Sequence, residues 1–163
     1  MKAEVNGLNE KLVELLIKQG KYVSTAESCT GGLLSALITD VSGSSAVLEE
    51  CIVTYSNAAK MRELGVAAQT LEAHGAVSVE TAREMCEGIC KHTGADVGIG
   101  ITGIAGPTGG TEDKPVGTVC IGVCVDGRIE ATREHFDGGR DEVRESSCIF
   151  ALNRAIEMLE GRQ

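Results

Sequence analysis

Residues 22–39, YVSTAESCTGGLLSALIT, form the stretch of sequence that decides the fold class. The first five residues predict a short strand, and the apolar run from Gly32 to about Thr39 predicts a helix. A turn of small polar residues and two glycines joins the two. This order of strand, turn and helix places the side chains of the turn at the positive end of a helix.

Helices and strands alternate along the rest of the chain. Apolar residues at helical spacing, with capping residues before them and glycines after them, predict helices over residues 8–19, 57–64, 69–74, 79–91 and 141–159. Strands are predicted over residues 51–55, 96–102, 116–125 and 129–136, and the hairpin signal Asp126-Gly127 joins the last two. We therefore expect an α/β fold, a three-layer α/β/α sandwich with a mixed sheet of about five strands, formed as one domain by residues 1–163.

The charge balance restricts the classes of partner. The chain has 163 residues, with 15 Lys and Arg against 24 Asp and Glu, which gives a formal net charge of −9. A general nucleic-acid surface is not expected, because such surfaces neutralise phosphates with Lys and Arg. The residues after Met1 are polar and charged, and no apolar run approaches the roughly 18 residues of a membrane span. We expect a cytoplasmic protein with no secretory signal and no membrane contact.

Seven cysteines are an odd number, and without an export signal they favour free thiols over disulfides. No CxxC motif occurs and no histidine accompanies the cysteines, so we expect no metal ion. Cys86 and Cys90, like Cys120 and Cys124, have the spacing of small buried side chains. Cys29 differs, because a helix N-terminus lowers the pKa of a thiol and makes it a second candidate nucleophile.

Ser28 is the first candidate for a catalytic residue. It lies in AESCTGG, residues 26–32, where backbone N–H groups and the positive end of the helix would stabilise a developing oxyanion. The competing interpretation is an ordinary helix cap, in which the glycines only permit a tight turn. The segment lacks the GxSxG pattern of the nucleophile elbow.

A serine nucleophile needs a base, and the histidines at positions 74, 92 and 135 are scattered along the chain. Lys60 is the other option, since it lies in YSNAAK, close to Tyr55, at the start of a predicted helix. A free lysine has a pKa of about 10.4, so burial or a neighbouring cation would have to lower it before Lys60 accepts the proton of Ser28. A solvated surface charge is the competing interpretation.

Residues 103–110, GIAGPTGG, form a loop in which four glycines let backbone amides approach a ligand. Phosphate or carboxylate is the expected ligand group, and a plain flexible connection is the alternative. The overlapping GIGITG, residues 98–103, matches the dinucleotide fingerprint, but its glycines fall inside a predicted strand. We interpret the surplus of glycine, 21 residues in all, mostly as backbone cleared for a small phosphorylated ligand.

Arg140 and Arg144 lie four residues apart at the start of the last predicted helix. Two cations at the positive end of a helix are unfavourable unless an anion compensates them, which suggests a substrate phosphate. The alternative is pairing with nearby carboxylates, those of Asp137, Asp141 or Glu145.

Five segments, in order and in register, resemble the CinA C-terminal family: AESCTGG, VTYSNAAK, HGAVS, ITGIAGPTGG and KPVGTV. The resemblance runs from about Leu8 to Leu159 and implies a three-layer α/β/α sandwich with a mixed sheet. The family includes stand-alone nicotinamide-mononucleotide deamidases. The resemblance therefore implies an amidohydrolase of pyridine-nucleotide recycling that forms nicotinate mononucleotide and ammonia without a cofactor. We expect the chain to lack the N-terminal domain of full-length CinA proteins, and nothing that depends on that domain is carried over.

The resemblance also implies roles for individual residues. The residues expected to be catalytic are Ser28, Lys60 and Tyr55: the catalytic serine and lysine of the family fall on Ser28 and Lys60, and Tyr55 lies close to that pair. The residues expected to bind substrate are Cys29, Thr30, Gly31, Gly32, Thr102, Gly103, Ala105, Gly106 and Arg140. As a hypothesis, Ser28 attacks the carboxamide carbon, neutral Lys60 takes its proton, and backbone amides of residues 30–32 hold the oxyanion.

Two other functions remain open from the sequence. One is a non-catalytic nucleotide-binding or regulatory module linked to competence or DNA damage, and the other is thiol chemistry at Cys29. The expected partner is a phosphorylated pyridine nucleotide. A homodimer is the expected assembly, because it is the commonest one among soluble oligomers.

Overall fold

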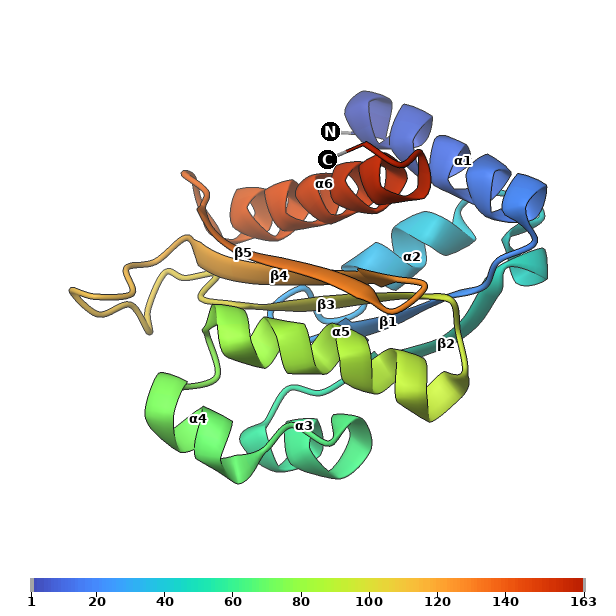
Figure 1. The fold of residues 1–163 in the computed structure, drawn as a ribbon. Helices are drawn as coiled ribbons and strands as arrows, with labels where there is room; N and C mark the ends of the chain where they lie inside the picture. Colours follow the sequence, from blue (N-terminus) through green and yellow to red (C-terminus); the bar gives the residue numbers. More distant parts are fainter. Residues whose placement is uncertain (1, 163) are drawn as a thin grey trace.

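The computed structural model describes residues 2–162, and Figure 1 shows how they are arranged. The helices are α1 (Lys2–Gln19), α2 (Leu33–Thr39), α3 (Asn57–Leu64), α4 (Ala68–His74), α5 (Val79–Thr93), α6 (Arg140–Leu159) and the short 3-10 helix η1 (Ser44–Ala46). The strands are β1 (Val23–Glu27), β2 (Leu48–Val53), β3 (Val97–Gly103), β4 (Thr118–Val125) and β5 (Arg128–His135). Each predicted helix and strand is present. α1 begins six residues before its predicted start, at Lys2 rather than Leu8, and the other ends shift by three residues or fewer.

The five strands form one mixed sheet in the order β2-β1-β3-β4-β5, which confirms the predicted fold class. β1 runs parallel to its neighbours β2 and β3, whereas the pairs β3–β4 and β4–β5 are antiparallel. The hairpin prediction is also confirmed, because Asp126 and Gly127 both have positive φ angles, 51° and 84°, as a type I′ turn requires. After β1 the chain proceeds to the strand on one side of it and then crosses to β3 on the other side.

Helices cover both faces of the sheet and complete the three layers (Figure 1). One face packs against α1, α2 and α6, and the larger apolar core lies between them and the sheet. The other face packs against α5, with α3 and α4 outside it. A second, smaller core lies on this side, formed by Ala26, Leu64, Val66, Met85 and Ile89.

Helix α5 approaches the sheet closely because glycines face it. A Cβ atom on Gly98 would lie 2.4 Å from the carbonyl oxygen of Cys86, and one on Gly122 would lie 2.4 Å from that of Ala82. A Cβ on Gly100 would likewise meet backbone of α5 at 2.9 Å. The interpretation of the glycine surplus as backbone cleared for a ligand, which includes the seven glycines between positions 94 and 110, is therefore wrong for Gly98 and Gly100, which admit a helix instead.

Strand β2 differs most from its prediction, since it begins at Leu48 and ends at Val53 rather than covering residues 51–55. It is an edge strand, and Glu49 and Glu50 are exposed on it. Edge strands tolerate such charges, which hide the alternation that marks a strand in sequence. Tyr55 consequently lies in the loop after β2. Among the helices of the described residues, none has the length and apolar character needed to cross a membrane.

Candidate active site

The parallel strands bring three segments of the chain to one edge of the sheet. Glu27, the last residue of β1, pairs with Val53 of β2 and with Ile101 of β3. The residues that follow, Ser28 and Thr54, therefore lie at the same level. In open α/β sheets, ligands bind outside the carboxyl ends of strands where the chain departs to opposite sides, and β1 and β3 form such a point here.

Ser28 begins the tight turn between β1 and α2. Its N–H donates to the carbonyl of Ile101 at 2.9 Å, and its own carbonyl accepts from the N–H of Gly31 at 3.0 Å. Gly31 and Gly32 have φ angles of 58° and 101°, a left-handed conformation that glycine adopts without strain. The two glycines are thus required by the backbone of the turn, as the sequence suggested.

Glu27 anchors the start of α2 through hydrogen bonds, a role that the sequence did not predict. Its carboxylate is fully buried and accepts from the N–H groups of Leu34 and Ser35, at 2.9 and 3.1 Å, and from the hydroxyl of Ser35 at 2.5 Å. It therefore satisfies the free N–H groups at the start of α2, where Gly32 offers no side-chain cap. An acidic residue just before a predicted helix start is the signal that would have indicated it.

Lys60 meets Ser28 inside the protein. Its Nζ donates to Oγ of Ser28 at 3.0 Å and to the carbonyl oxygen of Thr54 at 2.8 Å. Only 1% of Lys60 is exposed, and this burial lowers the pKa of the ammonium group because it disfavours the charged form. Lys60 is therefore not a solvated surface charge. Ser56, which accepts from the N–H of Ala59, caps the helix that carries it.

Cys29 does not have the activated thiol that its position suggested. Burial raises the pKa of Cys29 to about 12, a larger effect than the lowering by its own backbone amide and by the nearby charges of Arg144 and Lys60. The prediction of a lowered pKa was wrong, because the side chain enters the core rather than facing the solvent at the helix end. All seven cysteines are free thiols.

A cavity of about 290 Å³ opens beside Ser28 and Lys60, close to the lower end of the usual size range of small-molecule sites. Nine of the predicted site residues line it: Ser28, Cys29, Tyr55, Lys60, Thr102, Gly103, Ala105, Gly106 and Arg140. The other three predicted residues, Thr30, Gly31 and Gly32, are not among its lining residues. Ile104, Thr108 and Gly109 of the predicted ligand loop, residues 103–110, also line the cavity. Three residues without a predicted role complete the lining: Asn57, Ala76 and Val77.

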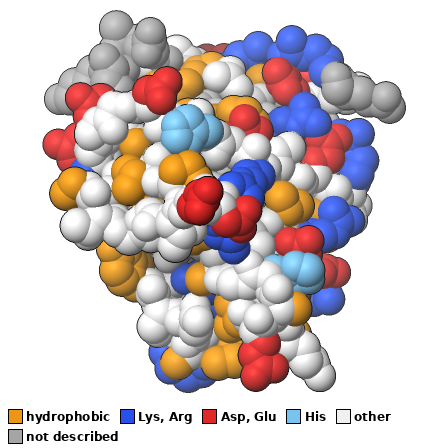
Figure 2. Space-filling view, turned by 90° about the vertical axis from the view of Figure 1, so that its left-hand side faces the viewer, with side chains coloured by type: hydrophobic (Ala, Val, Ile, Leu, Met, Phe, Trp, Pro, Cys, Tyr) orange, Lys and Arg blue, Asp and Glu red, His pale blue; other side chains and the backbone are white. Residues whose placement is uncertain are grey.

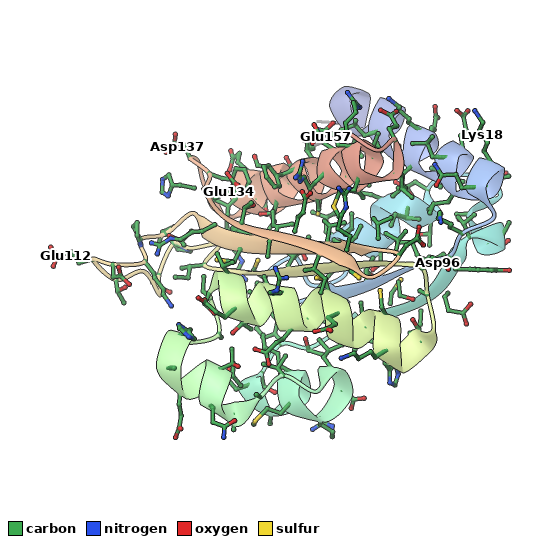
Figure 3. All side chains as sticks on the ribbon, in the orientation of Figure 1. Lys18, Asp96, Glu112, Glu134, Asp137 and Glu157 are labelled. Atoms are coloured by element: carbon green, nitrogen blue, oxygen red, sulfur yellow. The ribbon has the colours of Figure 1, made fainter. Side chains whose placement is uncertain are left out.

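The lining of the cavity mixes polar and apolar residues, and its basic side chains favour an anion. It includes Lys60 and Arg140 and no Asp or Glu. Figure 3 shows Glu112 at the tip of the loop after β3, pointing away from the sheet, with Asp137 also directed outward at this end. Thr102 supports the wall, since its buried hydroxyl donates to the carbonyl of Ala76 at 2.9 Å.

The two arginines of the last helix have different partners. Arg140 donates to the carbonyl of Gly106 at 2.7 Å and to the hydroxyl of Tyr55 at 3.3 Å, so it joins two loops at the cavity. Arg144 instead donates to the carbonyls of Cys29 and Thr30, and it does not line the cavity. The expectation that both arginines share one anion is therefore wrong for Arg144, and the pairing of either with a neighbouring carboxylate is not seen among residues 2–162.

Figure 2 shows the end of the molecule at which the loop after β3 lies. In the coloured part of this face, Lys and Arg side chains are interspersed with Asp and Glu, so no extended surface of one charge is seen there. In the part of the chain that the structure describes, no group of three or more His, Cys, Asp or Glu side chains is placed to hold a metal ion.

Comparisons with known proteins agree with this architecture. A CinA-like protein of Kosmotoga olearia is 51% identical over 146 residues, which cover 90% of this chain and 35% of that protein. The chain thus spans about a third of the length of the curated relatives it matches. The crystal structure of a competence-damaged protein (CinA) superfamily protein from Klebsiella pneumoniae has a TM-score of 0.92 and 38% identity, covering 96% of this chain and 98% of that one.

The crystal structure of a competence/damage inducible protein from Agrobacterium tumefaciens is similar to the same degree, with a TM-score of 0.92 and 39% identity over 96% of each chain. The family described as the CinA C-terminal domain matches residues 5–159. That match includes every residue that lines the cavity. This chain belongs to the CinA C-terminal domain family.

Proposed function

We propose that this chain hydrolyses the carboxamide of nicotinamide mononucleotide to nicotinate mononucleotide and ammonia, with Ser28 as nucleophile and Lys60 as its base. The observation that carries the proposal is the 3.0 Å contact between Nζ of Lys60 and Oγ of Ser28 inside the protein, beside the cavity. A nucleophile within hydrogen-bond reach of a base is the arrangement that covalent catalysis needs.

Burial prepares Lys60 for the first step. Because its pKa is lowered, a larger fraction of Lys60 is neutral at a given pH than of an exposed lysine. Neutral Lys60 takes the proton of the Ser28 hydroxyl while Oγ bonds to the carboxamide carbon. The carbonyl π electrons move to oxygen, and backbone N–H groups of the turn after Ser28 stabilise that oxyanion.

The leaving group takes the same proton. The protonated Nζ of Lys60 donates to the amide nitrogen as the C–N bond breaks, which releases ammonia and leaves an ester between Ser28 and the nicotinoyl group. Water then attacks the ester carbon and gives its proton to Lys60, which returns it to Oγ of Ser28. The cycle needs no cofactor beyond water and the two side chains.

Arg140 is the residue we assign to the substrate phosphate. Its guanidinium is held at the cavity by Gly106 and Tyr55 rather than by a carboxylate, so its charge stays available to an anion. Tyr55 lines the cavity, but its hydroxyl contacts Arg140 and its side chain is 64% exposed. We therefore assign Tyr55 to substrate binding rather than to proton transfer.

A second function has support in the names of the relatives, several of which are called competence-damage inducible proteins. A regulatory module of this kind would bind a nucleotide at residues 102–110 without turnover. The buried lysine and serine favour the enzyme, because a binding module has no need to bury a lysine against a hydroxyl group at the cost of its desolvation.

Ammonia release from nicotinamide mononucleotide separates these functions. The wild-type chain should release ammonia, and Ser28→Ala and Lys60→Ala should not. Full activity of Ser28→Ala would exclude the serine mechanism, and loss in Cys29→Ala alone would support thiol chemistry. Nucleotide binding without ammonia from any pyridine nucleotide would favour the regulatory module.

A further inference from the structure

Arg144, in the second turn of α6, forms its hydrogen bonds with the turn that carries Ser28. Its Nε donates to the carbonyl of Cys29 at 3.1 Å, and its Nη2 donates to the carbonyl of Thr30 at 2.9 Å. The side chain is half-buried, and the ion pairs formed by residues 2–162 do not include it. The hydrogen bonds of this guanidinium thus go to two main-chain carbonyls of one turn, which points to a local task.

Fixing these carbonyls fixes the amides next to them. In a trans peptide the N–H points opposite to the C=O of the same peptide unit. Because Arg144 holds the carbonyl of Cys29, the N–H of Thr30 points away from the guanidinium. In the same way, the hydrogen bond from Gly31 to the carbonyl of Ser28 directs the N–H of Cys29 outward. Within the described residues, neither N–H donates to another residue.

The turn needs such a clamp because its own sequence is permissive. Gly31 and Gly32 both have left-handed φ angles, and glycine moves among many conformations at little cost. The rigid, planar fork of an arginine loses little freedom when it binds two acceptors at once. Its positive charge also polarises the peptide unit between Cys29 and Thr30, which strengthens the N–H of Thr30 as a donor.

We propose that Arg144 is the positioning residue of the catalytic turn. By holding the carbonyls of Cys29 and Thr30 it directs the N–H of Thr30 toward the oxyanion, and it steadies the hydrogen bond from Gly31 to Ser28 that directs the N–H of Cys29 the same way. This inference rests on the proposed function, because an oxyanion forms only if Ser28 attacks a carbonyl. The inference gives the two arginines of α6 different roles: Arg140 binds the substrate, and Arg144 positions the N–H groups that stabilise the transition state.

The test compares Arg144→Ala and Arg144→Lys with Arg154→Ala, a matched control on the same helix whose ion pairs involve Glu130 and Glu157. With nicotinamide mononucleotide, kcat of Arg144→Ala should fall about 100-fold, the lower end of the loss seen when an oxyanion donor is removed, with KM within about threefold of wild type. The kcat of Arg144→Lys should lie between those of Arg144→Ala and wild type, and both kcat and KM of Arg154→Ala should match wild type. A raised KM at unchanged kcat would overturn the inference, since it would mean that Arg144 binds the ground-state substrate.

A second readout separates positioning from a purely structural role. The 3-formylpyridine analogue of nicotinamide mononucleotide carries an aldehyde, to which Oγ of Ser28 adds to form a tetrahedral hemiacetal. Its affinity should fall in parallel with kcat in Arg144→Ala, and added guanidinium ion should restore part of both. If Arg144→Ala does not fold, Arg144→Lys decides by the same measurements. Analogue affinity equal to wild type in the folded variants would overturn the inference.

The inference and the proposed function fail in different ways. If the wild-type chain releases no ammonia from nicotinamide mononucleotide, the proposed substrate is wrong, and a fluorophosphonate then tests Arg144 alone. Oγ of Ser28 bonds to phosphorus as fluoride leaves, and Lys60 takes the proton, so labelling needs the nucleophile and its oxyanion donors but no nucleotide. Labelling of Ser28 should be about 100-fold slower in Arg144→Ala than in Arg154→Ala. Equal labelling rates would refute the role of Arg144. In the opposite case, wild type releases ammonia, Ser28→Ala and Lys60→Ala do not, and Arg144→Ala keeps the wild-type rate: the proposed function then stands and the role of Arg144 fails.

Discussion

Nζ of Lys60 lies 3.0 Å from Oγ of Ser28, although 32 residues separate the two in the chain. The sheet explains the contact. Ser28 follows β1, Lys60 follows β2 after a short loop, and the two strands are parallel neighbours whose last residues pair with each other. The N–H of Thr54 donates to the carbonyl of Glu27, which fixes the two departing segments side by side.

The first prediction concerns this pair of residues. Ser28→Ala should lose more than about 10⁴-fold in kcat, because no other described hydroxyl lies against Lys60 to replace the nucleophile. Lys60→Ala should lose about 10²–10⁴-fold, the usual contribution of a general base. Steady-state ammonia release measures both. The exposed residues Ser45 and Lys91 supply the matched controls Ser45→Ala and Lys91→Ala, whose rates should equal that of wild type.

The pKa of Lys60 predicts a pH dependence of stability. The folded protein lowers this pKa below 10.5, so between the folded value and 10.5 the unfolded chain binds more protons. Stability contributed by this site therefore rises with pH through that window, and at lower pH the folded state carries the cost of a buried charge. Lys60→Met removes this cost.

The free energy of unfolding of Lys60→Met, minus that of wild type, should accordingly decrease as the pH rises from 7 toward 10.5. Urea unfolding at several pH values measures this difference. Lys91→Met, at an exposed position, should show a constant difference. A flat curve for Lys60→Met as well would mean that burial does not lower the pKa of Lys60.

Arg140→Ala should weaken the binding of phosphorylated substrate. Hydrogen bonds to charged groups contribute about 1.5–3 kcal/mol, so KM for nicotinamide mononucleotide should rise about 10–100-fold. KM for nicotinamide riboside, which lacks the phosphate, should change little. Equal increases for both substrates would indicate that Arg140 acts by holding the loop at Gly106 instead.

Thiol labelling tests the burial of Cys29. With its pKa raised to about 12, only about one Cys29 in 10⁴ is a thiolate at pH 8, whereas Cys51 is exposed on β2. Brief treatment with iodoacetamide should label Cys51 and leave Cys29 unmodified, as mass spectrometry of the digested protein would show. Unfolded protein, in which all seven cysteines react, is the control. Comparable rates at Cys29 and Cys51 would contradict the raised pKa.

Two glycine-to-alanine substitutions should change the free energy of unfolding in opposite directions. Gly98→Ala places a Cβ 2.4 Å from backbone of α5 and should destabilise the fold by about 1–3 kcal/mol. Gly7→Ala, in α1 with no atom within 4 Å of the new Cβ, should stabilise it by about 0.5–1 kcal/mol. Urea unfolding measures both changes. A neutral Gly98→Ala would show that α5 moves away from the sheet at no cost.

Local sequence patterns predicted the helices, the strands and the fold class, because the signal for each helix or strand lies within a few neighbouring residues. The hairpin at Asp126 and Gly127 is an example, since positive φ at both positions favours those two residues. Strand order carries no such local signal. That β1 lies between β2 and β3 is decided by tertiary packing, and the contact of Ser28 with Lys60 depends on that order.

The arginines show where residue patterns stop being informative. Arg140 and Arg144 have the same chemistry and the same helical setting, and only the position of the turn after β1 decides that one faces the cavity and the other the carbonyls of Cys29 and Thr30. The glycines at positions 98 and 100 misled for a related reason, because a glycine that admits a helix looks in sequence like one that admits a ligand.

The glycine-lined contact between α5 and the sheet also bears on the composition of the chain. The core on this side of the sheet is small, and its members are aliphatic or methionine: Ala26, Leu64, Val66, Met85 and Ile89. Of the four aromatic residues, Phe136 and Phe150 pack edge to face beside the other core, and both tyrosines are exposed. On this side of the sheet, glycines at positions 98, 100 and 122 let the backbones approach so closely that the core between them needs no aromatic side chain.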